Sequence, residues 1–562
     1  MISVKVLVLC KKYLLEYKGT LTVFITLILA STAISIVSPF IIGNFLDNLI
    51  EGEGVNGIMR FAALFGGLNL LRILKNYITS IIQIKMHTQM SYNLIRDAIE
   101  HIQNLPLSYT NNQDSAYLSK RVGDDANSLI GFSIRTTQSI LVNAAMLVVP
   151  FAVLLYMNHF VAMFMIGFLV VYITLYFIFK KPLYNAGFAF MESQDKFFSR
   201  LLEQLKHIKL IKLNSVQKQM LKRADSSFAD FKGTAIHKQK VNSLYSGLDG
   251  SISTFAQIAL FVVGGIQVLT GNFTIGMFTV FTSYFKMMLG ASKYFFGLGA
   301  SYLQTLASYD RIGEIFMQKA ESQGYRVLEG IGGIELRDVG FSYAVQGKNE
   351  PQESIAKFNQ VGIKRVISNY NAKFTTGRIY AISGVNGTGK STLISLIAGM
   401  YVDEFSGTIT YNGIDIRSID MVKTRKDFLG YADQESVLIS DSIGYNLEFD
   451  YVGASEEKEH ALRGCMEILN MEDFITERTL GFEINDKNTN MSVGERQKIS
   501  VLKVLYKNPL VMIFDEPTSA LDTDTTYKFI EHLKKIKRDR IIIIITHDEY
   551  IKGQCDEVVE LS

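Results

Sequence analysis

Long hydrophobic stretches alternate with polar connections in the first part of this 562-residue chain. A helix rises about 1.5 Å per residue, so about 20 apolar residues cross the roughly 30 Å hydrocarbon core of a bilayer. Six stretches are long enough, near Leu21–Ile42, Met59–Ile84, Ile140–Met157, Phe160–Phe179, Ser251–Leu269 and Thr274–Leu298. The pattern therefore predicts six transmembrane helices.

The connections between these stretches differ in charge, and this difference predicts their orientation. Gly43–Asn56, Met157–His159 and Gly271–Phe273 contain no Lys or Arg. The opposite connections, 85–135 and 180–237, are long and rich in basic residues. Because basic loops stay on the cytoplasmic side, both termini and the last third of the chain are expected there.

The two basic connections are too long to be turns. Charged, helix-forming runs such as SYNLIRDAIEHIQNL and FFSRLLEQLKHIKLIKLN predict that the membrane helices continue into the cytosol. Solvated helical hairpins with no special task are the alternative. The N-terminal segment MISVKVLVLCKKYLLEYKG lacks the apolar core and cleavage site of a signal peptide. It predicts an amphipathic helix on the membrane surface, with a buried soluble helix as the alternative.

The chain changes character after the sixth stretch. A helical run ends near Ala320, a polar linker follows over 321–333, and 334–562 mixes polar and apolar residues as a soluble domain does. We therefore expect a helical transmembrane domain over 1–320 and a separate domain over 334–562. The net charge of +3 gives no reason to expect a nucleic-acid partner, and three scattered cysteines imply no disulfide framework.

A glycine-rich segment, GVNGTGKST, begins at Gly384 and fits G-x-x-x-x-G-K-[ST] through Gly389, Lys390 and Ser391. The strand-like run RIYAIS precedes it and the helix-like run STLISLIAGM follows, which is the setting of a phosphate-binding loop. Its backbone N–H groups can close around phosphates at a helix N-terminus, where the dipole favours anions. Lys390 is expected to reach the β- and γ-phosphates, and the Ser391 hydroxyl to bind Mg²⁺.

Two further apolar strands end in residues suited to nucleotide hydrolysis. LVMIFDE ends in Asp515, which suits Mg²⁺, and Glu516, which suits the general base that polarises the attacking water. IIIIITH ends in His547, which is expected to contact the γ-phosphate. Taken alone, Asp515 and Glu516 could simply cap the end of a strand, and His547 could be a structural histidine. Their order after Lys390 favours a catalytic role.

Other short segments complete a recognisable order: Gln434, MSVGE at 491–495 and SALD at 519–522. With the phosphate loop, the acidic strand and His547, they resemble the ATP-binding cassette (ABC) family. There they match the Q-loop, the signature motif and the D-loop, and His547 matches the switch histidine. The resemblance extends over essentially the whole chain. LPLSYTNNQDSAYLSKRVGDDANSL resembles the family's first coupling region, and ASYDRIGEIF resembles its exit from the sixth span.

The resemblance implies an exporter-type half-transporter, with an all-α six-helix transmembrane domain followed by an α/β P-loop ATPase domain that uses ATP and Mg²⁺. It implies catalytic roles for Glu516 and His547, and Mg²⁺ ligation by Ser391, Gln434 and Asp515. The residues implied to bind ATP within one chain are Tyr343, Gly384, Asn386, Gly387, Gly389, Lys390, Ser391, Thr392 and Gln434. Those implied to bind the ATP of the opposite chain are Ser492, Gly494, Glu495 and Asp522.

The sequence departs from the family pattern at two places. The signature usually has two glycines after its serine, and Val493 replaces the first, which is expected to alter affinity or closure. The adenine-stacking aromatic is expected to be Tyr343, with Phe341 as the alternative. The segment AVQGKNEPQESIAKFNQ after Tyr343 makes the stretch to the phosphate loop unusually long.

Charged residues within the predicted spans are costly and usually functional. At about 1.5 Å per residue, Arg72 lies about 20 Å deep and Lys286 about 18 Å deep from the outer surface. If both face the transport pathway, the cavity is basic and suits a cargo with an anionic group. Asp249 and Lys293 lie near the inner boundary and could pair, but snorkelling of Lys75 and Lys293 to the headgroups is the favoured interpretation.

The sequence as a whole predicts an ATP-driven exporter in the cell membrane, with its ATPase domain cytoplasmic, and most consistent with a bacterial plasma membrane. The cargo is expected to be a peptide, a lipid or an amphipathic small molecule. The family places each ATP between two chains, so a homodimer is expected, with a heterodimer as the alternative. A membrane-bound ABC sensor or regulator and an import-direction transporter stay open as alternatives, whereas six spans argue against a soluble ABC ATPase.

Overall fold

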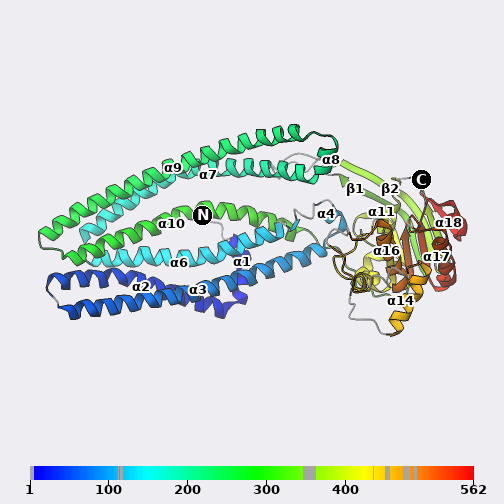
Figure 1. The fold of residues 1–562 in the computed structure, drawn as a ribbon, viewed down its shortest axis with the longest axis horizontal. Coiled ribbons are helices and arrows are strands. Elements are labelled where there is room, and N and C mark those ends of the chain that lie inside the picture. The colour runs from blue at the N-terminus through cyan, green and yellow to red at the C-terminus, as the bar shows by residue number, and fades with distance from the viewer. Residues whose placement is uncertain are drawn as a thin grey trace. The chain divides into compact units, whose positions relative to one another are not determined.

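The computed structural model describes residues 5–52, 54–111, 113, 118–119, 121–157, 159–345, 362–385, 387–434, 436–449, 456–471, 480–485, 490–519 and 521–561. The chain divides into two compact units. The helical unit comprises Met1–Glu100 and Ser115–Met317, and the sheet unit comprises His101–Asp114 and Gln318–Ser562. Figure 1 shows the elements of both units.

The helical unit is built from long helices joined by short connections. Its elements are α1 (Lys5–Glu16), α2 (Lys18–Ile50), α3 (Val55–Gln103, of which the part up to Glu100 belongs here), the π-helical turn η1 (Arg121–Asp125), α6 (Ala126–Met157), α7 (His159–Lys206), α8 (Ile208–Leu213), α9 (Gln217–Leu269) and α10 (Ile275–Met317). Helices α3, α7 and α9 extend far beyond the apolar stretches, so the predicted continuation of the membrane helices through the basic connections is confirmed.

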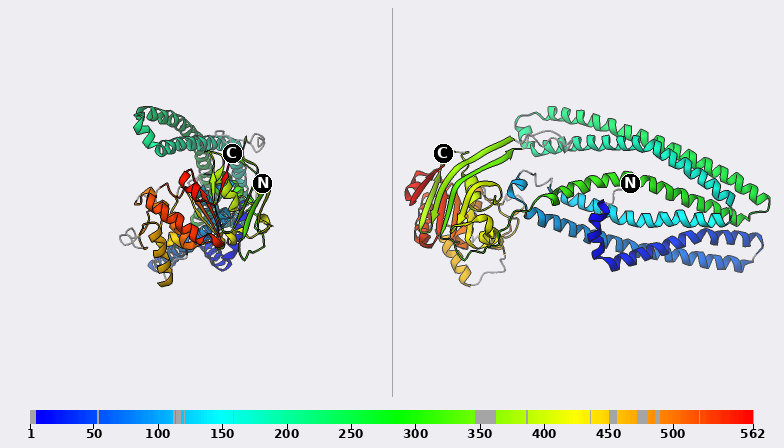
Figure 2. Two further views of the ribbon diagram at one scale, coloured as in Figure 1. Left: turned by 90° about the vertical axis from the view of Figure 1, so that its right-hand side faces the viewer. Right: turned by 180° about the vertical axis from the view of Figure 1, so that it is seen from behind.

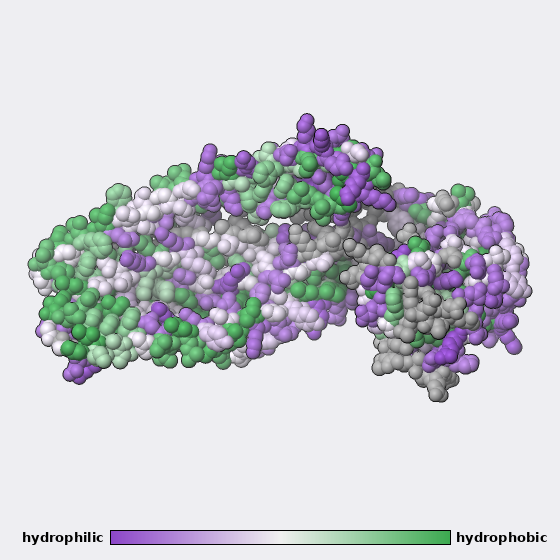
Figure 3. Space-filling view, in the orientation of Figure 1, coloured by the Kyte–Doolittle hydropathy of each residue, from purple (hydrophilic) through white to green (hydrophobic). Residues whose placement is uncertain are grey.

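Within the residues that the structure describes, five helices are long and apolar enough to cross a membrane, over Lys18–Ile50, Val55–Gln103, Arg121–Met157, Ile166–Lys206 and Gln217–Leu269. They correspond to the first five predicted spans. The sixth prediction corresponds to α10, which is long but does not reach the same apolarity in the described part of the chain, because lysine and hydroxyl side chains interrupt it. Apolar side chains gather on the end of this unit where α2 joins α3 and α9 joins α10 (Figure 3).

Apolar packing between the long helices holds the helical unit together. Helices α7 and α9 run side by side, as both views of Figure 2 and Figure 1 show, while α10 packs on α6 and α2. One buried cluster surrounds Leu94, Leu129 and Ile312. A second surrounds Leu154 and Tyr284. Because α10 contributes to both clusters, it ties α2, α3, α6 and α9 into one body.

The N-terminal helix α1 is amphipathic, as predicted. Cys10 and Tyr13 are buried in the cluster around Leu94, while Lys11 and Lys12 are exposed. The Lys12 ammonium and the Tyr13 hydroxyl both donate to Asp97 of α3, at 2.8 and 2.9 Å. The apolar face of α1 therefore packs on the long helices, and its basic face stays in solvent.

The sheet unit contains two sheets. Strands β1 (Gly333–Val345), β2 (Gly362–Thr375), β4 (Phe405–Tyr411) and β5 (Ile414–Asp415) form an antiparallel sheet in the order β2-β1-β4-β5. Strands β3 (Arg378–Ser383), β6 (Leu429–Ala432), β7 (Val511–Asp515), β8 (Ile541–Ile545) and β9 (Glu557–Glu560) form a parallel sheet in the order β6-β7-β8-β3-β9.

Helices cover these sheets. They are α4 (Leu107–Asn111), α11 (Lys390–Ile397), η2 (Ile416–Ser418), α12 (Met421–Phe428), α13 (Ile443–Leu447), α14 (Glu456–Ile468), α16 (Val493–Lys507), α17 (Thr523–Ile536), η3 (Lys537–Asp539) and α18 (Glu549–Gln554). Strands β7 and β8 are fully buried, as expected of parallel strands covered on both faces. The predicted α/β domain is confirmed.

The register of the parallel sheet decides where its chemistry lies. Asp515, the last residue of β7, pairs with Ile545, the last residue of β8, and Ile382 of β3 pairs with the same Ile545. The carboxyl ends of three neighbouring strands therefore meet at one edge. Open α/β sheets bind ligands at this edge.

Candidate functional site

The loop between β3 and α11 has a backbone that only glycine adopts easily. Gly387 and Gly389 have φ angles of +90° and +97°. A Cβ atom at Gly389 would lie 2.6 Å from Cγ1 of Val366, so a side chain is excluded by packing as well as by conformation. Thr392 and Lys390 follow in the first turn of α11, where free N–H groups and the dipole attract anions.

Lys390 is buried to 8% exposure and its ammonium turns back over the loop. Its Nζ donates to the carbonyl oxygens of Gly384 and Val385 at 2.6 and 3.3 Å, and lies 3.0 Å from Nε2 of His547. The loop thus holds a cation that has no carboxylate partner in the described part of the chain. Such a cation can exchange these contacts for phosphate oxygens, which bind an ammonium more strongly.

Ser391 and Asp515 form the acidic side of the site. The Ser391 hydroxyl lies 3.4 Å from Oδ2 of Asp515, and the Tyr431 hydroxyl lies 3.5 Å from the same oxygen. Burial, followed by the charges of Asp433 and Glu516, raises the pKa of Asp515 to about 6. A buried carboxylate beside a serine hydroxyl and further carboxylates is a donor set that fits a hard divalent cation such as Mg²⁺.

The raised pKa of Asp515 predicts a specific pH effect on stability. The folded chain holds the proton up to about pH 6, whereas the unfolded chain releases it near 3.8. The free energy of unfolding should therefore fall as the pH rises through this window. In EDTA and without nucleotide, Asp515→Asn should raise the melting temperature at pH 8, because it removes a cost of at most about 3 kcal/mol in the free energy of unfolding. This gain should vanish below about pH 4, where Asp515 is protonated in both the folded and the unfolded chain.

Thermal unfolding followed by fluorescence at several pH values measures this difference. Glu467→Gln is the matched control, because Glu467 is an exposed carboxylate of α14. A gain that is the same at pH 4 and pH 8 would refute the assigned cause, since neutralising a buried charge matters only where that charge exists.

Glu516 is held in an unusual backbone conformation. Its φ is +46°, in the left-handed region that costs a non-glycine residue about 1 kcal/mol or more. Its N–H donates to the Ile545 carbonyl at 3.0 Å. Its carboxylate accepts from the Gln434 amide at 2.9 Å and lies 3.7 Å from Nε2 of His547. The backbone thus turns the carboxylate of Glu516 toward Gln434 and His547, which the sequence analysis assigned to the same site.

Gln497 is a residue of this site that sequence reasoning missed. It is 3% exposed, and its amide donates to the Glu516 carbonyl at 2.7 Å and to the Ser519 hydroxyl at 2.8 Å. The signal was available, because Gln497 shares a helix face with the buried Val501 and Val504. A polar side chain on an apolar stripe needs a partner, and here it fixes the loop of Glu516.

The structure separates the two candidate aromatic residues of β1. Phe341 is 2% exposed and lies inside the apolar core, so it offers no face to a base. Tyr343 is half-buried, meets Phe341 edge-on, and its hydroxyl lies 3.1 Å from that of Thr392. Tyr343 is thus the one that reaches the phosphate loop. The long segment after it falls mostly outside the described residues, as does Asn386.

The signature segment begins α16. Ser492 caps the helix by accepting from the Glu495 N–H at 3.1 Å, and Glu495 accepts in return from the Ser492 N–H at 2.6 Å. This reciprocal cap fixes the loop geometry. Val493 is 69% exposed and Gly494 is partly exposed beside it. Asp522 similarly caps α17 through the Thr525 N–H at 2.8 Å, so both segments present rigid, solvent-facing helix starts.

The predicted first coupling region contributes a short helix to the sheet unit. Leu107 of α4 packs on the core of that unit, and the Ser108 hydroxyl donates to Glu404. Tyr401, three residues before Glu404, contacts Phe341 in a tilted ring pair with centroids 4.7 Å apart. Burial, followed by the neighbouring Tyr343 hydroxyl, raises the pKa of Tyr401. Tyr401 and Phe341 therefore lie between the segment that α4 contacts and Tyr343.

The charged residues of the predicted spans differ in their exposure and in their partners. Arg72 of α3 is half-buried and Lys286 of α10 is exposed in the single chain. Lys293 of α10 forms an ion pair with Asp249 of α9 at 2.7 Å. The pairing of Lys293 with Asp249 that the sequence allowed is therefore formed, while its snorkelling to the headgroups stays a prediction. A neighbouring helix supplies a carboxylate within reach, and pairing compensates a charge better than partial hydration does.

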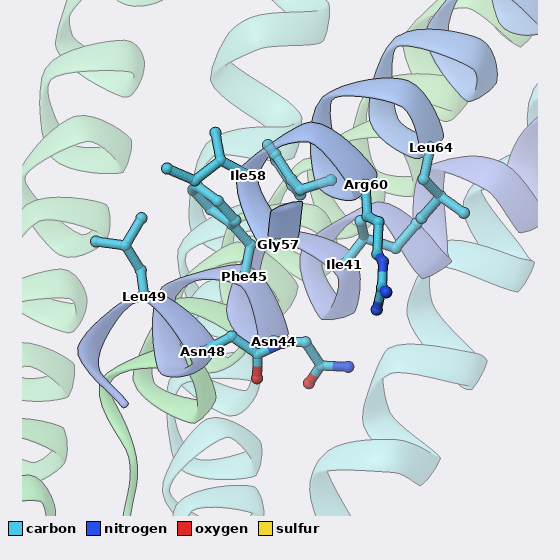
Figure 4. A pocket seen from close by; sticks show the side chains of 10 residues that line it. Ile41, Asn44, Phe45, Asn48, Leu49, Gly57, Ile58, Arg60 and Leu64 are labelled. Carbon is cyan, nitrogen blue, oxygen red and sulfur yellow. The ribbon is translucent and has the colours of Figure 1, made fainter. Parts of the chain in front are cut away.

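A cavity of 290 Å³ lies between α2 and α3 near their connection. Figure 4 shows the polar side chains of Asn44, Asn48 and Arg60 pointing to one side, and Leu49 and Ile58 pointing to the other. The arginine of this cavity is Arg60, at the start of α3. It lies nearer the α2–α3 connection than Arg72, so this cavity is not the basic cavity that the sequence predicts around Arg72.

Two family models match the chain. One, described as "ABC transporter transmembrane region", matches residues 21–292, and the other, described as "ABC transporter", matches residues 367–519. The first covers most of the helical unit, and the second covers the phosphate loop, Gln434, the signature segment and the strand of Asp515.

Curated proteins are similar over most of this chain. "ABC transporter B family member 1" of Dictyostelium discoideum is 27% identical over 80% of the chain, which spans 48% of that protein's length. "Lactococcin-G-processing and transport ATP-binding protein LagD" of Lactococcus lactis subsp. lactis is 24% identical over 94% of the chain and 73% of its own length. "ATP-dependent lipid A-core flippase" of Syntrophus aciditrophicus is 25% identical, over 82% and 74%.

A solved structure shares the fold. It is titled "Structure of a bacterial Atm1-family ABC exporter with ATP bound" and superposes with a TM-score of 0.80. The match covers 97% of this chain and 93% of that chain at 18% sequence identity. At this identity the likeness concerns the fold of the chain, from the long helices to the two sheets.

Proposed function

The chain belongs to the ABC transporter family as a half-transporter that fuses a transmembrane and a nucleotide-binding domain, and we propose that it exports an amphipathic cargo from the cytoplasm. It is a multi-pass membrane protein and an ATPase coupled to transport. The observation that supports the proposal is the meeting of Lys390, Ser391, Asp515, Glu516 and His547 at the carboxyl edge of one parallel sheet. Similarity to a peptide transporter and a lipid flippase supports an amphipathic cargo without deciding between them.

Each residue of the site has a role in this proposal. Lys390 and the backbone N–H groups of Gly387 and Gly389 hold the β- and γ-phosphates of ATP. Ser391, Asp515 and Gln434 would hold Mg²⁺, whose charge would offset the charge that develops on the phosphates.

Two residues act directly on the reaction. Glu516 polarises the attacking water, and His547 donates to the γ-phosphate while it lies beside Lys390. The Gln434 amide donates to Glu516 at 2.9 Å, which orients the carboxylate before the water arrives.

Two copies of the chain are proposed to form the active unit. The capped segment at Ser492 and Gly494 faces solvent in the single chain, with Val493 69% exposed. Its serine hydroxyl and helix N-terminus would bind the phosphates of an ATP held by the phosphate loop of a partner chain. Since one chain contains every element, a homodimer with two competent sites needs no other subunit, and a heterodimer is the alternative.

Directional transport is the test of the proposal. The charge pattern of the loops supports a cytoplasmic ATPase domain, and we propose a bacterial plasma membrane as its location. In sealed inside-out vesicles, ATP should drive two fluorescent amphipathic probes, an anionic lipid and a peptide, into the lumen. Uptake in right-side-out vesicles would indicate an importer. ATP hydrolysis that responds to probes without any movement would indicate a sensor or regulator.

Lys286 gives a prediction about the cargo. In the proposal its exposed ammonium lines the pathway, together with Arg72, because an unpaired charge facing lipid would be strongly disfavoured. Lys286→Met keeps the length and apolar stem but removes the charge. Stimulation of ATPase by dodecyl phosphate should fall about tenfold or more, while stimulation by the zwitterion dodecylphosphocholine should not change.

Lys286→Arg is the matched variant for Lys286, since it restores a cation at the same position. It should recover most of the stimulation by dodecyl phosphate. Equal stimulation of the parent chain and of Lys286→Met by dodecyl phosphate would show that Lys286 does not face the pathway.

A further inference from the structure

A cavity of 530 Å³ lies between α6 and α10 within the helical unit. Its walls come from positions spaced three or four residues apart on each helix, such as Ser128, Phe132 and Arg135 on α6 and Leu298 and Ser301 on α10. This spacing presents one face of each helix to the other. The cavity is thus a product of helix packing, and it is large enough for the polar head of a small amphipathic molecule.

The lining of this cavity is rich in hydroxyl groups. They belong to Ser128, Thr136, Ser139, Tyr294, Ser301 and Thr305. Arg135 is the only charged residue among the lining residues, and none of them is a carboxylate. The Tyr294 hydroxyl oxygen is buried beside the hydroxyl groups of Ser139 and Thr136. Because hydroxyl groups can rotate to donate, the wall offers several donors around one positive charge.

The positive charge of Arg135 is not neutralised in the described part of the chain. Its Nε donates to the Gly131 carbonyl of its own helix at 3.1 Å, and no carboxylate there forms an ion pair with it. Two buried or partly buried ion pairs hold acidic residues of the adjoining turns. Asp125 accepts from Arg311 at 2.7 Å, and Glu314 pairs with Arg121. The guanidinium therefore remains available to an external anion.

The cavity also has an apolar side. Phe132 and Leu298 are both 7 to 8% exposed and belong to the buried cluster around Leu94. By the predicted spans, Arg135 precedes the third span at Ile140, and Leu298 ends the sixth. The cavity would then lie at the cytoplasmic edge of the membrane, where an amphipathic molecule places its head group in the polar layer and its tail in the hydrocarbon.

We infer that this cavity binds the oxyanion head, phosphate or carboxylate, of a single-tailed amphipathic cargo, with Arg135 as the residue that selects the charge. A guanidinium matches two oxygens of a phosphate or a carboxylate with a pair of parallel hydrogen bonds. The hydroxyl groups complete the shell, while a cationic head would meet an uncompensated arginine. The inference rests on the proposed export of an amphipathic cargo, and it adds the charge of the head group and the place where it is first held.

The absence of tryptophan from the chain permits a direct binding measurement. Phe132→Trp places the sole tryptophan on the cavity wall, where the aromatic ring already lies 6.2 Å from that of Tyr302. The full chain is placed in phosphatidylcholine nanodiscs without nucleotide. It is titrated with dodecyl phosphate, with laurate, with dodecylphosphocholine as a zwitterion of equal chain length, and with inorganic phosphate.

Dodecyl phosphate and laurate should change the fluorescence saturably, with affinities at least tenfold higher than that of dodecylphosphocholine. Arg135→Gln should weaken binding of the two anions at least tenfold, and Arg135→Lys should restore part of it. Arg96→Gln, which removes an exposed arginine of α3 that does not line the cavity, should bind like the parent. Inorganic phosphate should compete only weakly, because it lacks the tail that Phe132 and Leu298 accommodate.

Three results would overturn the inference: equal affinity for the zwitterion, no effect of Arg135→Gln, or inorganic phosphate binding as tightly as dodecyl phosphate. Leu298→Trp provides a second reporter on α10, so failure of Phe132→Trp to fold does not end the test. The outcome is separate from that of the proposed function. Vesicle transport without probe binding refutes this site alone, and probe binding without transport of any cargo refutes the export proposal alone.

Discussion

Glu516→Gln should reduce the rate of ATP hydrolysis by about 100-fold or more while leaving ATP binding intact, because general-base catalysis contributes a factor of that size. The amide keeps the shape of the side chain and can still contact Gln434, which lies 2.9 Å from the carboxylate. Asp515 and Ser391, which would hold Mg²⁺, are unchanged. The variant should therefore accumulate as an ATP-bound closed dimer, which crosslinking and size measurements in ATP and Mg²⁺ can detect.

Glu549→Gln is a suitable control, because Glu549 is an exposed carboxylate of α18 that contacts only Lys552 in the described structure. Its ATPase rate should equal that of the parent. Near-normal turnover of Glu516→Gln would show that another group activates the water. Loss of ATP binding in that variant would instead indicate that the carboxylate supports the loop, whose φ of +46° at Glu516 is already strained.

Mixed dimers of Gly494→Asp and Lys390→Ala chains should retain one working site, whereas each variant alone should lose both. Lys390→Ala removes a charge-assisted phosphate contact, which should weaken ATP binding about ten- to a hundredfold. Gly494→Asp places a carboxylate at the exposed start of α16, where it would repel the phosphates of the partner's ATP. In the mixture, one site carries both lesions and the other carries neither.

ATP-dependent closure and about half of the parent's ATPase rate per dimer are expected in that mixture, if the two sites act independently. Co-purification with two different affinity tags isolates the mixed dimers. Parent chains paired with Lys390→Ala are the control for tag effects. Equal loss of activity in the mixed dimers and in both single variants would contradict the placement of each ATP between two chains, or would show that hydrolysis requires both sites to be intact.

The chemistry of the sheet unit was predictable because its residues lie at strand ends and in loops with local signatures. A phosphate loop needs glycine at positions with positive φ, and Gly387 and Gly389 have such angles. Asp515, Glu516 and His547 follow continuous apolar strands, so their place at one edge follows from the parallel order of the sheet. The membrane spans were predictable for a similar reason, since length and apolarity are properties of a single segment.

Contacts between distant segments were not predictable in this way. Nothing local to Lys293 shows that Asp249 of another helix lies 2.7 Å away, so hydration and pairing could not be separated. The left-handed backbone of Glu516 and its support by Gln497 depend on where α16 places Gln497 relative to the end of β7. A serine or threonine in a helix can face lipid, its own backbone or a neighbouring helix, and the pattern of one helix does not distinguish these.

The sequence by itself determined the family, the order of the two domains, most of the apolar spans and the residues proposed to meet the nucleotide, because each of these signals lies within a short contiguous segment. Only the tertiary structure decided that Tyr343 rather than the buried Phe341 reaches the phosphate loop, and that α4 packs on the sheet unit. It alone brought Arg135 and the hydroxyl groups of α6 and α10 around one cavity. The physical reason is that burial and pairing are properties of packed surfaces, and a surface exists only after distant segments have met.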